Sequence, residues 1–269
     1  MKMQKFKSLM LAAALIGLSS VTSYAATPKL INIRFGGGNA DPSFKGAGAI
    51  GMTGDFWNIA PALHPDGGIG TVADLNLLWA DGTGSSSVLF SYISDAVVSA
   101  GYANTGFIAD AENKELMSNY VYTAPGSPYD TITITNLNKN LDYNLYALSQ
   151  TETTVGNAGG NGQWLELSVL GNSTYSIKQT AASNGTSGTF IPGQNVISGL
   201  VRPDASGNLT ITYLSQVPGA TAPVNRASLN ALQLSPTPEP ASMLLLGIGG
   251  ALLSARKLRK KKAAESLVS

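Results

Sequence analysis

The chain has 269 residues, a formal net charge of +1, no cysteine and a single histidine, His64. This composition excludes a thiol nucleophile and a cysteine-ligated zinc site, and it leaves no histidine cluster for a metal. Between residues 26 and 238 the sequence holds 8 Lys and Arg against 14 Asp and Glu, a balance of −6. An acidic body without a basic stripe speaks against nucleic acid as a partner. We expect no metal and no cofactor.

The first 25 residues have the three parts of a secretory signal peptide. Three lysines precede a short apolar run at 9–18, and small side chains at Ser23 and Ala25 precede a cleavage point. The apolar run is too short to span a bilayer as a retained anchor. We therefore expect cleavage between Ala25 and Ala26, and export through the inner membrane.

The body, residues 26–234, reads as short strands separated by Gly, Asn, Ser and Pro turns. Several strands alternate with period two, as where Ile132 and Ile134 alternate with threonines, so that one face is buried and the other is wet. This pattern predicts an all-β fold, an antiparallel β-sandwich or a jelly roll. The expected strands are residues 30–35, 75–80, 87–93, 129–137, 142–148, 163–170, 174–180, 195–201, 209–214 and 227–234.

One short helix is expected within the body, at residues 111–120. Asp110 is suited to cap its first turn, and Leu116 and Met117 are spaced to face the core. No long repeat and no second domain is indicated.

Two stretches of the body resemble known sandwich families. Residues 129–148 resemble the strand–loop–strand of fibronectin-III-like and carbohydrate-binding-like sandwiches, in which a Leu before the loop and a Tyr after it fix the corner. Leu137 and Tyr143 are the counterparts in this sequence. The stretch GDFWN at 54–58 resembles jelly-roll bodies often attached to sorting tails. Both resemblances imply a fold rather than an activity.

Catalytic motifs do not stand out in the body. GAGAIG at 46–51 has the glycine spacing of a dinucleotide loop, but no strand feeds it directly and no helix follows, so we interpret it as tight backbone packing. The sequence has no G-x-S-x-G and no H-E-x-x-H. His64 is interpreted as a surface or turn-stabilising residue. The sequence thus favours a protein that is not an enzyme.

Trp164 and Glu166 are the candidate ligand-binding residues. On a strand they share one face with Ser168, while Leu165, Leu167 and Val169 share the other. A buried leucine face would leave a tryptophan beside an acid, an arrangement that can stack on a sugar ring and accept its hydroxyls. The alternative is that Trp164 packs beneath the glycine-rich loop that precedes it. Trp57 and Trp79 are expected in the core.

The C-terminal segment has three parts in order: a Pro-rich linker at 235–240, an apolar run at 241–258 and a basic tail at 259–269. The linker contains Pro238, Glu239 and Pro240. The uncharged stretch 241–255 is about 22 Å long as a helix, so it crosses a bilayer only with snorkelling of the first basic side chains. The positive-inside rule places on the cytoplasmic side the basic stop cluster of Arg256, Lys257, Arg259, Lys260, Lys261 and Lys262.

This segment resembles the PEP-CTERM sorting signal: a Pro-Glu-Pro motif, a short apolar helix and a cluster of basic residues. The resemblance implies recognition by an exosortase, a membrane-embedded processing enzyme of Gram-negative bacteria, and removal of the tail near the tripeptide. Association with the inner membrane would then be transient. Seven residues after the last lysine, AAESLVS, extend beyond the pattern usual for the family.

These observations predict an exported, non-catalytic protein of the cell surface or the exopolysaccharide matrix. One alternative is a glycan-binding module that uses Trp164 and Glu166. A second is a glycan-active hydrolase, which needs only two carboxylates across a cleft.

Overall fold

The computed structural model describes residues 29–36, 44–61, 70–94, 96–98, 116–117, 119–123, 130–150, 164–181, 189–215 and 227–237. The chain divides into two units, Met1–Thr237 and Pro238–Ser269. The second unit lies outside the described residues, as do the expected signal peptide, its cleavage point and the expected helix at 241–258. Within the described ranges, no helix is long and apolar enough to cross a membrane.

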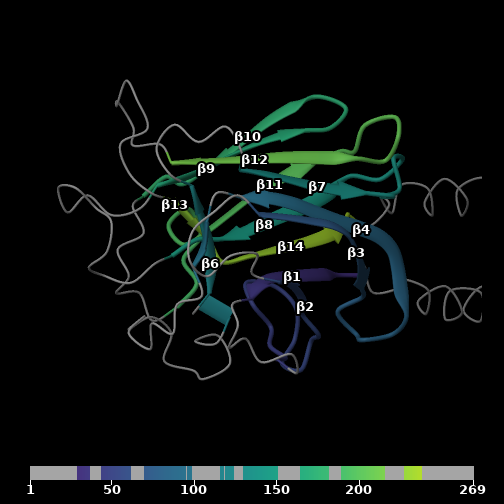
Figure 1. The fold of residues 1–269 in the computed structure, drawn as a ribbon, viewed down its shortest axis with the longest axis horizontal. Helices are drawn as coiled ribbons and strands as arrows, with labels where there is room; N and C mark the ends of the chain where they lie inside the picture. Colours follow the sequence, from purple (N-terminus) through teal and green to yellow (C-terminus); the bar gives the residue numbers. More distant parts are fainter. Residues whose placement is uncertain are drawn as a thin grey trace, which may run out of the picture. The chain divides into compact units, whose positions relative to one another are not determined.

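The described strands form three sheets (Figure 1). The five-stranded sheet has the order β11-β8-β14-β1-β2, that is Val196–Val201, Tyr143–Leu148, Ala231–Pro236, Ile31–Gly36 and Asn58–Pro61. The six-stranded sheet has the order β10-β9-β12-β7-β4-β3, that is Thr174–Lys178, Leu165–Leu170, Leu209–Ser215, Thr131–Thr135, Ser85–Ser94 and Gly70–Leu78. The small sheet has the order β13-β6-β5, that is Ala227–Leu229, Tyr120–Thr123 and Ala96–Val98.

The ladders between these strands are antiparallel except for the parallel pair β1 and β2. The fold is therefore all-β with antiparallel sheets, as the sequence predicted. The two large sheets share one hydrophobic core, which takes side chains such as Ile33 and Leu232 from one sheet and Ile132 and Leu167 from the other. Burying each such side chain stabilises the fold by roughly 1.5–3 kcal/mol.

The expected strand at 227–234 is wrong in one respect, because the chain breaks at Asn230 and continues in a different sheet. The Asn230 side chain is fully buried, and its Nδ2 donates to Met117 O at 2.9 Å and to Asn119 O at 3.1 Å. β13 before it belongs to the small sheet and β14 after it to the five-stranded sheet. A polar side chain that satisfies distant backbone carbonyls thus sets the point at which the strand changes sheets.

The expected helix at 111–120 is confirmed only in its centre. Leu116 and Met117 are helical and fully buried, as expected of core-facing residues. Tyr120 instead begins β6. Asp110 and residues 111–115 lie outside the described residues.

The predicted corner after β7 is formed by the expected residues. Leu137 and Tyr143 are both buried, and the hydroxyl oxygen of Tyr143 accepts a 3.0 Å hydrogen bond from the Asn138 N–H. Leu137 N also donates to Gly207 O at 2.9 Å. Gly207 has a φ of 82°, and a Cβ at that position would overlap Leu137 O. Burial raises the pKa of the Tyr143 hydroxyl above its ordinary value.

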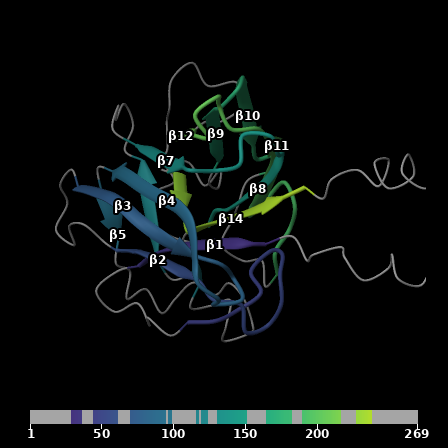
Figure 2. The ribbon, with the colours of Figure 1, turned by 90° about the vertical axis from the view of Figure 1, so that its right-hand side faces the viewer.

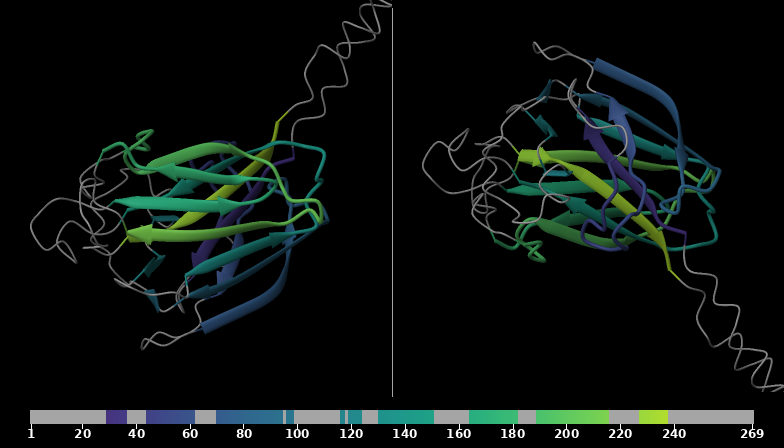
Figure 3. Two further views of the ribbon diagram at one scale, coloured as in Figure 1. Left: turned by 90° about the horizontal axis from the view of Figure 1, so that it is seen from above. Right: turned by 90° about the horizontal axis from the view of Figure 1, so that it is seen from below.

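The chain enters and leaves the described body on neighbouring strands. β1 and β14 are antiparallel partners, with Ile31 opposite Leu234 (Figure 2). Seen from above, the two strands lie side by side beneath the six-stranded sheet (Figure 3). β14 is flanked on its other side by β8, so it is an inner strand of its sheet. The end of β14 therefore lies beside the start of β1.

Candidate functional site

The predicted strand face around Trp164 has the orientation that the sequence indicated. Leu165, Leu167 and Val169 are buried to 1 % exposure or less and belong to the shared core. Trp164 and Glu166 are half-buried on the alternate side. The tryptophan and the acid therefore face away from the core.

Glu166 is already engaged in contacts on this face. The Ser176 hydroxyl donates a 2.7 Å hydrogen bond to Glu166 Oε1. Glu166 also lies directly opposite Lys178 on β10 and Leu214 on β12. A carboxylate opposite a lysine is a stabilising cross-strand pair. The acid therefore has a structural role on this sheet in addition to any role in binding.

The sheet surface next to Glu166 is a ladder of hydroxyls. Ser168 lies opposite Ser176 on β10 and opposite Thr212 on β12, and Thr212 lies opposite Thr131 on β7. These side chains are half-buried or exposed. The face can offer many weak hydrogen bonds to a polymer, but its polar groups lie on a sheet rather than around a hollow.

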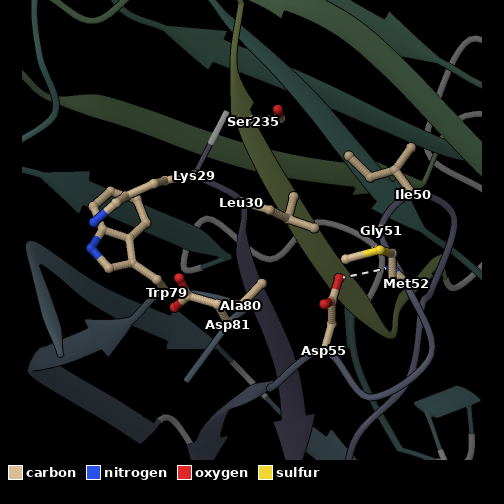
Figure 4. Close-up of a pocket in the computed structure, with 10 residues that line it drawn as sticks. All are labelled: Lys29, Leu30, Ile50, Gly51, Met52, Asp55, Trp79, Ala80, Asp81 and Ser235. Atoms are coloured by element: carbon tan, nitrogen blue, oxygen red, sulfur yellow. Dashed lines mark hydrogen bonds between the residues drawn. The ribbon is translucent and has the colours of Figure 1, made fainter. Parts of the chain in front are cut away.

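A second candidate site is a hollow of about 410 Å³ at the end of the body from which β14 leaves (Figure 4). Four segments of the chain meet there: the start of β1, the loop at 50–55, the turn after β3 and the end of β14. The hollow is lined by Lys29, Leu30, Ile50, Gly51, Met52, Asp55, Trp79, Ala80, Asp81 and Ser235.

Backbone hydrogen bonds hold the floor of the hollow. Ala80 N donates to Leu30 O at 2.8 Å, and Phe56 N donates to Ala80 O at 2.6 Å. Beside this floor, the Asn58 amide donates to Leu78 O at 2.9 Å and accepts from Leu78 N at 2.8 Å. The turn after β3 is therefore joined to both β1 and the segment leading into β2.

Asp55 forms one rim of the hollow, and its orientation is fixed. Met52 N donates to Asp55 Oδ2 at 2.9 Å, and Asp55 N donates to Met52 O at 3.1 Å. Gly51 has a φ of 108°, and a Cβ there would overlap Asp55 Oδ2 and come within 3.0 Å of Leu30. Glycine at position 51 therefore provides both the backbone conformation and the space that this carboxylate needs.

Asp81, Trp79 and Lys29 form the opposite rim. The Thr83 hydroxyl and the Thr83 N–H donate to Asp81 Oδ1 at 2.6 and 2.8 Å. These hydrogen bonds, with a smaller contribution from Lys29, lower the pKa of the Asp81 carboxyl. Lys29 Nζ lies 4.9 Å from the centre of the Trp79 ring, a cation–π contact. One rim thus combines an ionised acid, an ammonium group and an aromatic face.

Gln233 of β14 anchors the glycine-rich loop behind this hollow. Its Oε1 accepts from Ala49 N at 2.8 Å and from Ile50 N at 3.0 Å, and its Nε2 donates to Asn32 Oδ1 at 2.8 Å. Gly48, at a φ of 63°, lies where a Cβ would overlap the buried Trp57 ring. GAGAIG is therefore tight backbone packing, as the sequence predicted, and it covers Trp57 and supports the hollow.

The sequence predictions for the three tryptophans have different outcomes. Trp57 is in the core as expected, and its indole N–H donates to Gly46 O at 2.7 Å. The expectation for Trp79 is wrong in part, because the ring packs against the core but is only half-buried and lines the hollow. Trp79 lies in the turn that follows β3, and this turn brings its ring to the surface. His64 lies outside the described residues.

A buried polar cluster lies within the core. Tyr213 donates from its hydroxyl to Ser94 Oγ at 2.8 Å, and the Tyr213 oxygen is 3.4 Å from Asp130 Oδ1. Burial raises the pKa of Tyr213 well above its ordinary value, and the Asp130 charge acts in the same direction. Asp130 is only 1 % exposed, too deep to reach a polymer in solvent. Among the described residues, no group of three acidic or histidine side chains could hold a metal ion.

Comparison with known proteins identifies the C-terminal segment. Residues 236–260 match the PEP-CTERM protein-sorting motif. The match contains the predicted tripeptide Pro238, Glu239 and Pro240 and the first four residues of the basic stop cluster; Lys261 and Lys262 follow it. The chain thus carries the sorting signal of an exported protein that an exosortase recognises.

The chain is similar at low identity to solved structures. One of them is a xylan-binding domain, CBM22-1 of Xyn10C from Paenibacillus barcinonensis, with 12% sequence identity and a TM-score of 0.31, over 63% of this chain and 87% of that chain. No curated protein matches the chain.

Proposed function

We propose that this chain is an exported, non-catalytic protein of the cell surface or of the exopolysaccharide matrix, delivered by its sorting tail. The observation that supports this proposal is the continuity between body and signal: β14 ends at Pro236, where the sorting motif begins. Only residues 235–240 separate the last core position of β14 from the apolar run. Removal of the tail near the tripeptide would therefore leave the folded body as the part of the chain that is delivered to the surface.

The tail accounts for a passage through the inner membrane rather than permanent residence in it. Pro238 and Pro240 bias the residues before them toward extended backbone, which favours access of a processing enzyme to Glu239. The run at 241–258 then spans the bilayer with help from snorkelling, and the basic tail at 259–269 stays cytoplasmic. The exosortase is the partner for this step.

The test follows the full chain in a Gram-negative host that carries an exosortase and in the same host without it. We expect the body in the surface or matrix fraction only when the exosortase is present, and we expect Glu239→Ala to keep the chain in the membrane fraction. Glu265→Ala, outside the matched motif, is the matched control. Equal distribution of the chain in both hosts, or normal sorting of Glu239→Ala, would contradict the proposal.

The half-buried pair Trp164 and Glu166 favours a second candidate function, binding of the host's exopolysaccharide on the six-stranded sheet. The buried leucine face keeps both side chains at the surface, and the serine and threonine ladder beside them extends the polar surface. Co-sedimentation of the chain with that polysaccharide should be lost in Trp164→Ala and kept in Leu200→Ala, a change at an exposed side chain of β11 in the other large sheet. Unchanged binding by Trp164→Ala would contradict this role. Release of reducing ends during the incubation would instead favour the glycan-active hydrolase.

A further inference from the structure

The hollow at the end of β14 contains polar groups that the body's own hydrogen bonds leave available. Asp55 Oδ2 accepts from Met52 N, and Asp81 Oδ1 accepts from Thr83. Among the described residues, the second oxygen of each carboxylate and the Trp79 indole N–H have no hydrogen-bond partner. Lys29 Nζ contacts the Trp79 ring, with no carboxylate of the described residues within salt-bridge distance. The hollow therefore offers acceptors on both rims and donors on one.

The surface between the two rims is apolar. Leu30 lies between the Asp55 rim and the Trp79 rim, and Ile50 and Ala80 extend the floor (Figure 4). A ligand that fits must therefore present carbon-bound hydrogens to the floor and hydroxyl groups to the rims. Sugar rings combine these two surfaces, and the Trp79 indole N–H adds a hydrogen-bond donor at the rim.

The charges of the lining select among ligand classes. One ammonium and two carboxylates line the hollow. An anionic ligand would lie near the carboxylates of Asp55 and Asp81, which both line the hollow, and would be repelled. A cationic ligand would compete with Lys29, which already covers the Trp79 ring. An uncharged ligand with several hydroxyls meets neither obstacle.

Size and rigidity indicate a short ligand. A volume of about 410 Å³ is near the lower end of the roughly 300–1,000 Å³ that is typical of small-molecule sites. Both carboxylates are oriented before a ligand arrives, Asp55 by the 52–55 turn and Asp81 by Thr83. A site that needs little ordering loses less free energy on binding. We propose that this hollow binds a short neutral saccharide, or the end of a longer one, through Trp79, Asp55 and Asp81.

This binding activity is separate from sorting and from the Trp164 face, so each can fail without the other. The test uses the chain purified from its producing host and titrated with neutral xylo- and cello-oligosaccharides. An acidic oligogalacturonide and a cationic glucosamine oligomer complete the panel. Calorimetry gives the affinity, and tryptophan fluorescence reports the environment of the rings. We expect binding of at least one neutral series and none of the two charged ligands.

Two variants locate the binding. Trp79→Ala removes the ring and its indole N–H from the rim. Because the ring also packs against the core, this variant could lose binding through lost stability, so a second variant is needed. Asp81→Asn changes an exposed side chain, keeps an oxygen for the Thr83 hydrogen bonds and removes the charge. We expect each to weaken binding about tenfold or more, because each removes a group that would hydrogen-bond the ligand, and hydrogen bonds to a charged acceptor are stronger than those to a neutral one. Leu200→Ala, an exposed leucine on β11, should bind like the parent chain.

Three outcomes would overturn the proposal. The first is no binding of any neutral oligosaccharide. The second is tighter binding of a charged ligand than of the neutral ones. The third is an affinity for the neutral oligosaccharides that Asp81→Asn leaves unchanged. Normal surface delivery in any of these cases would leave the proposed function intact.

Discussion

Two places in the molecule have the same short pattern, a tryptophan followed two residues later by an acid, and the structure uses them differently. Trp164 directly precedes β9 and Glu166 is its second residue, so both lie on a broad sheet face, where Ser176 and Lys178 lie next to the acid. Trp79 and Asp81 follow the end of β3, where the chain turns and the acid bonds to Thr83 instead. The same local pattern becomes a surface pair in one place and the rim of a hollow in the other.

The difference lies in what the rest of the chain brings to each pair. At Trp79, the loop at 50–55 and the end of β14 close the opposite side. At Trp164, the neighbours are the strands of one sheet. Whether the pair lines a pocket or an open sheet face therefore depends on the neighbouring segments and not on the two residues themselves. The following experiments test that contrast.

The largest effect is expected from Gln233→Ala, which removes the anchor of the glycine-rich loop. The backbone N–H groups of Ala49 and Ile50 and the amide of Asn32 would lose their partner in a buried setting. We expect a loss of about 2–4 kcal/mol in the free energy of unfolding, since each unsatisfied buried group costs about 1–3 kcal/mol. Urea unfolding measures it. Thr133→Ala, on the sheet face, should change stability by less than about 0.5 kcal/mol; equal losses would contradict the anchoring role.

Gly51→Ala should act next, through Asp55. The added Cβ overlaps Asp55 Oδ2 at a φ of 108°, and such strained positions cost roughly 1–3 kcal/mol. Gly54→Ala is the matched control, because its φ of 94° is also unfavourable while no atom lies within 4 Å of the added carbon. We expect both variants to be destabilised and only Gly51→Ala to lose saccharide binding as well. Calorimetric titration of both proteins compares them, and equal affinities would show that Asp55 is not fixed by Gly51.

A small effect is expected on the sheet face. Glu166→Gln keeps an acceptor for the Ser176 hydroxyl but removes the charge opposite Lys178. Cross-strand charge pairs contribute roughly 0.2–1 kcal/mol, and half-exposed ones lie at the low end. Chemical denaturation should show a loss of about 0.5 kcal/mol or less. A loss of several kcal/mol would mean that the Glu166 charge is needed for stability, which would contradict the view of this face as a surface available for binding.

The subtlest change concerns the charge state of Asp81. Its pKa is lowered mainly by the Thr83 hydroxyl, so Thr83→Ala should raise the pKa toward the ordinary aspartate value of about 3.9. The carboxylate would then gain its proton at a higher pH than in the parent chain. An NMR titration of the Asp81 carboxyl carbon in the parent chain and in the variant detects the shift. An unchanged Asp81 titration would contradict the role of Thr83.

Strand positions could be predicted from the sequence where alternation is strong. β7 and β12, with apolar or aromatic side chains on one side and threonines on the other, were expected from period two alone. The short strands β2 and β5 were not expected, because runs of three or four residues carry too little pattern. The break at Asn230 was missed as well, since ASLNALQL reads as one strand and the reason for the break lies at Met117 and Asn119.

The two candidate sites also differ in how far the sequence predicts them. The Trp164 face follows from alternation within one strand, so the sequence indicated which side chains would share a surface. The hollow joins Lys29, Asp55, Asp81 and Ser235, which come from four separate segments. Trp79 was assigned to the core because its flanks are apolar, and only the turn after β3 shows otherwise. The Trp-x-acid pattern and the glycine-rich loop are both visible in the sequence. The sequence alone does not show that the two lie beside one another in the fold.

The inner position of β14 determines how the body would carry mechanical load. β8 and β1 pair with β14 on its two sides, over registers that run from Ala231 to Pro236 and from Ala231 to Leu234. A pull on the residues after Thr237 acts along the strand, and therefore across two ladders of hydrogen bonds that lie perpendicular to it. The hydrogen bonds of both ladders then bear the force together. At an edge strand peeled from its sheet, the bonds would instead open one at a time. The sorting tail is thus attached at a point of the fold suited to resist tension.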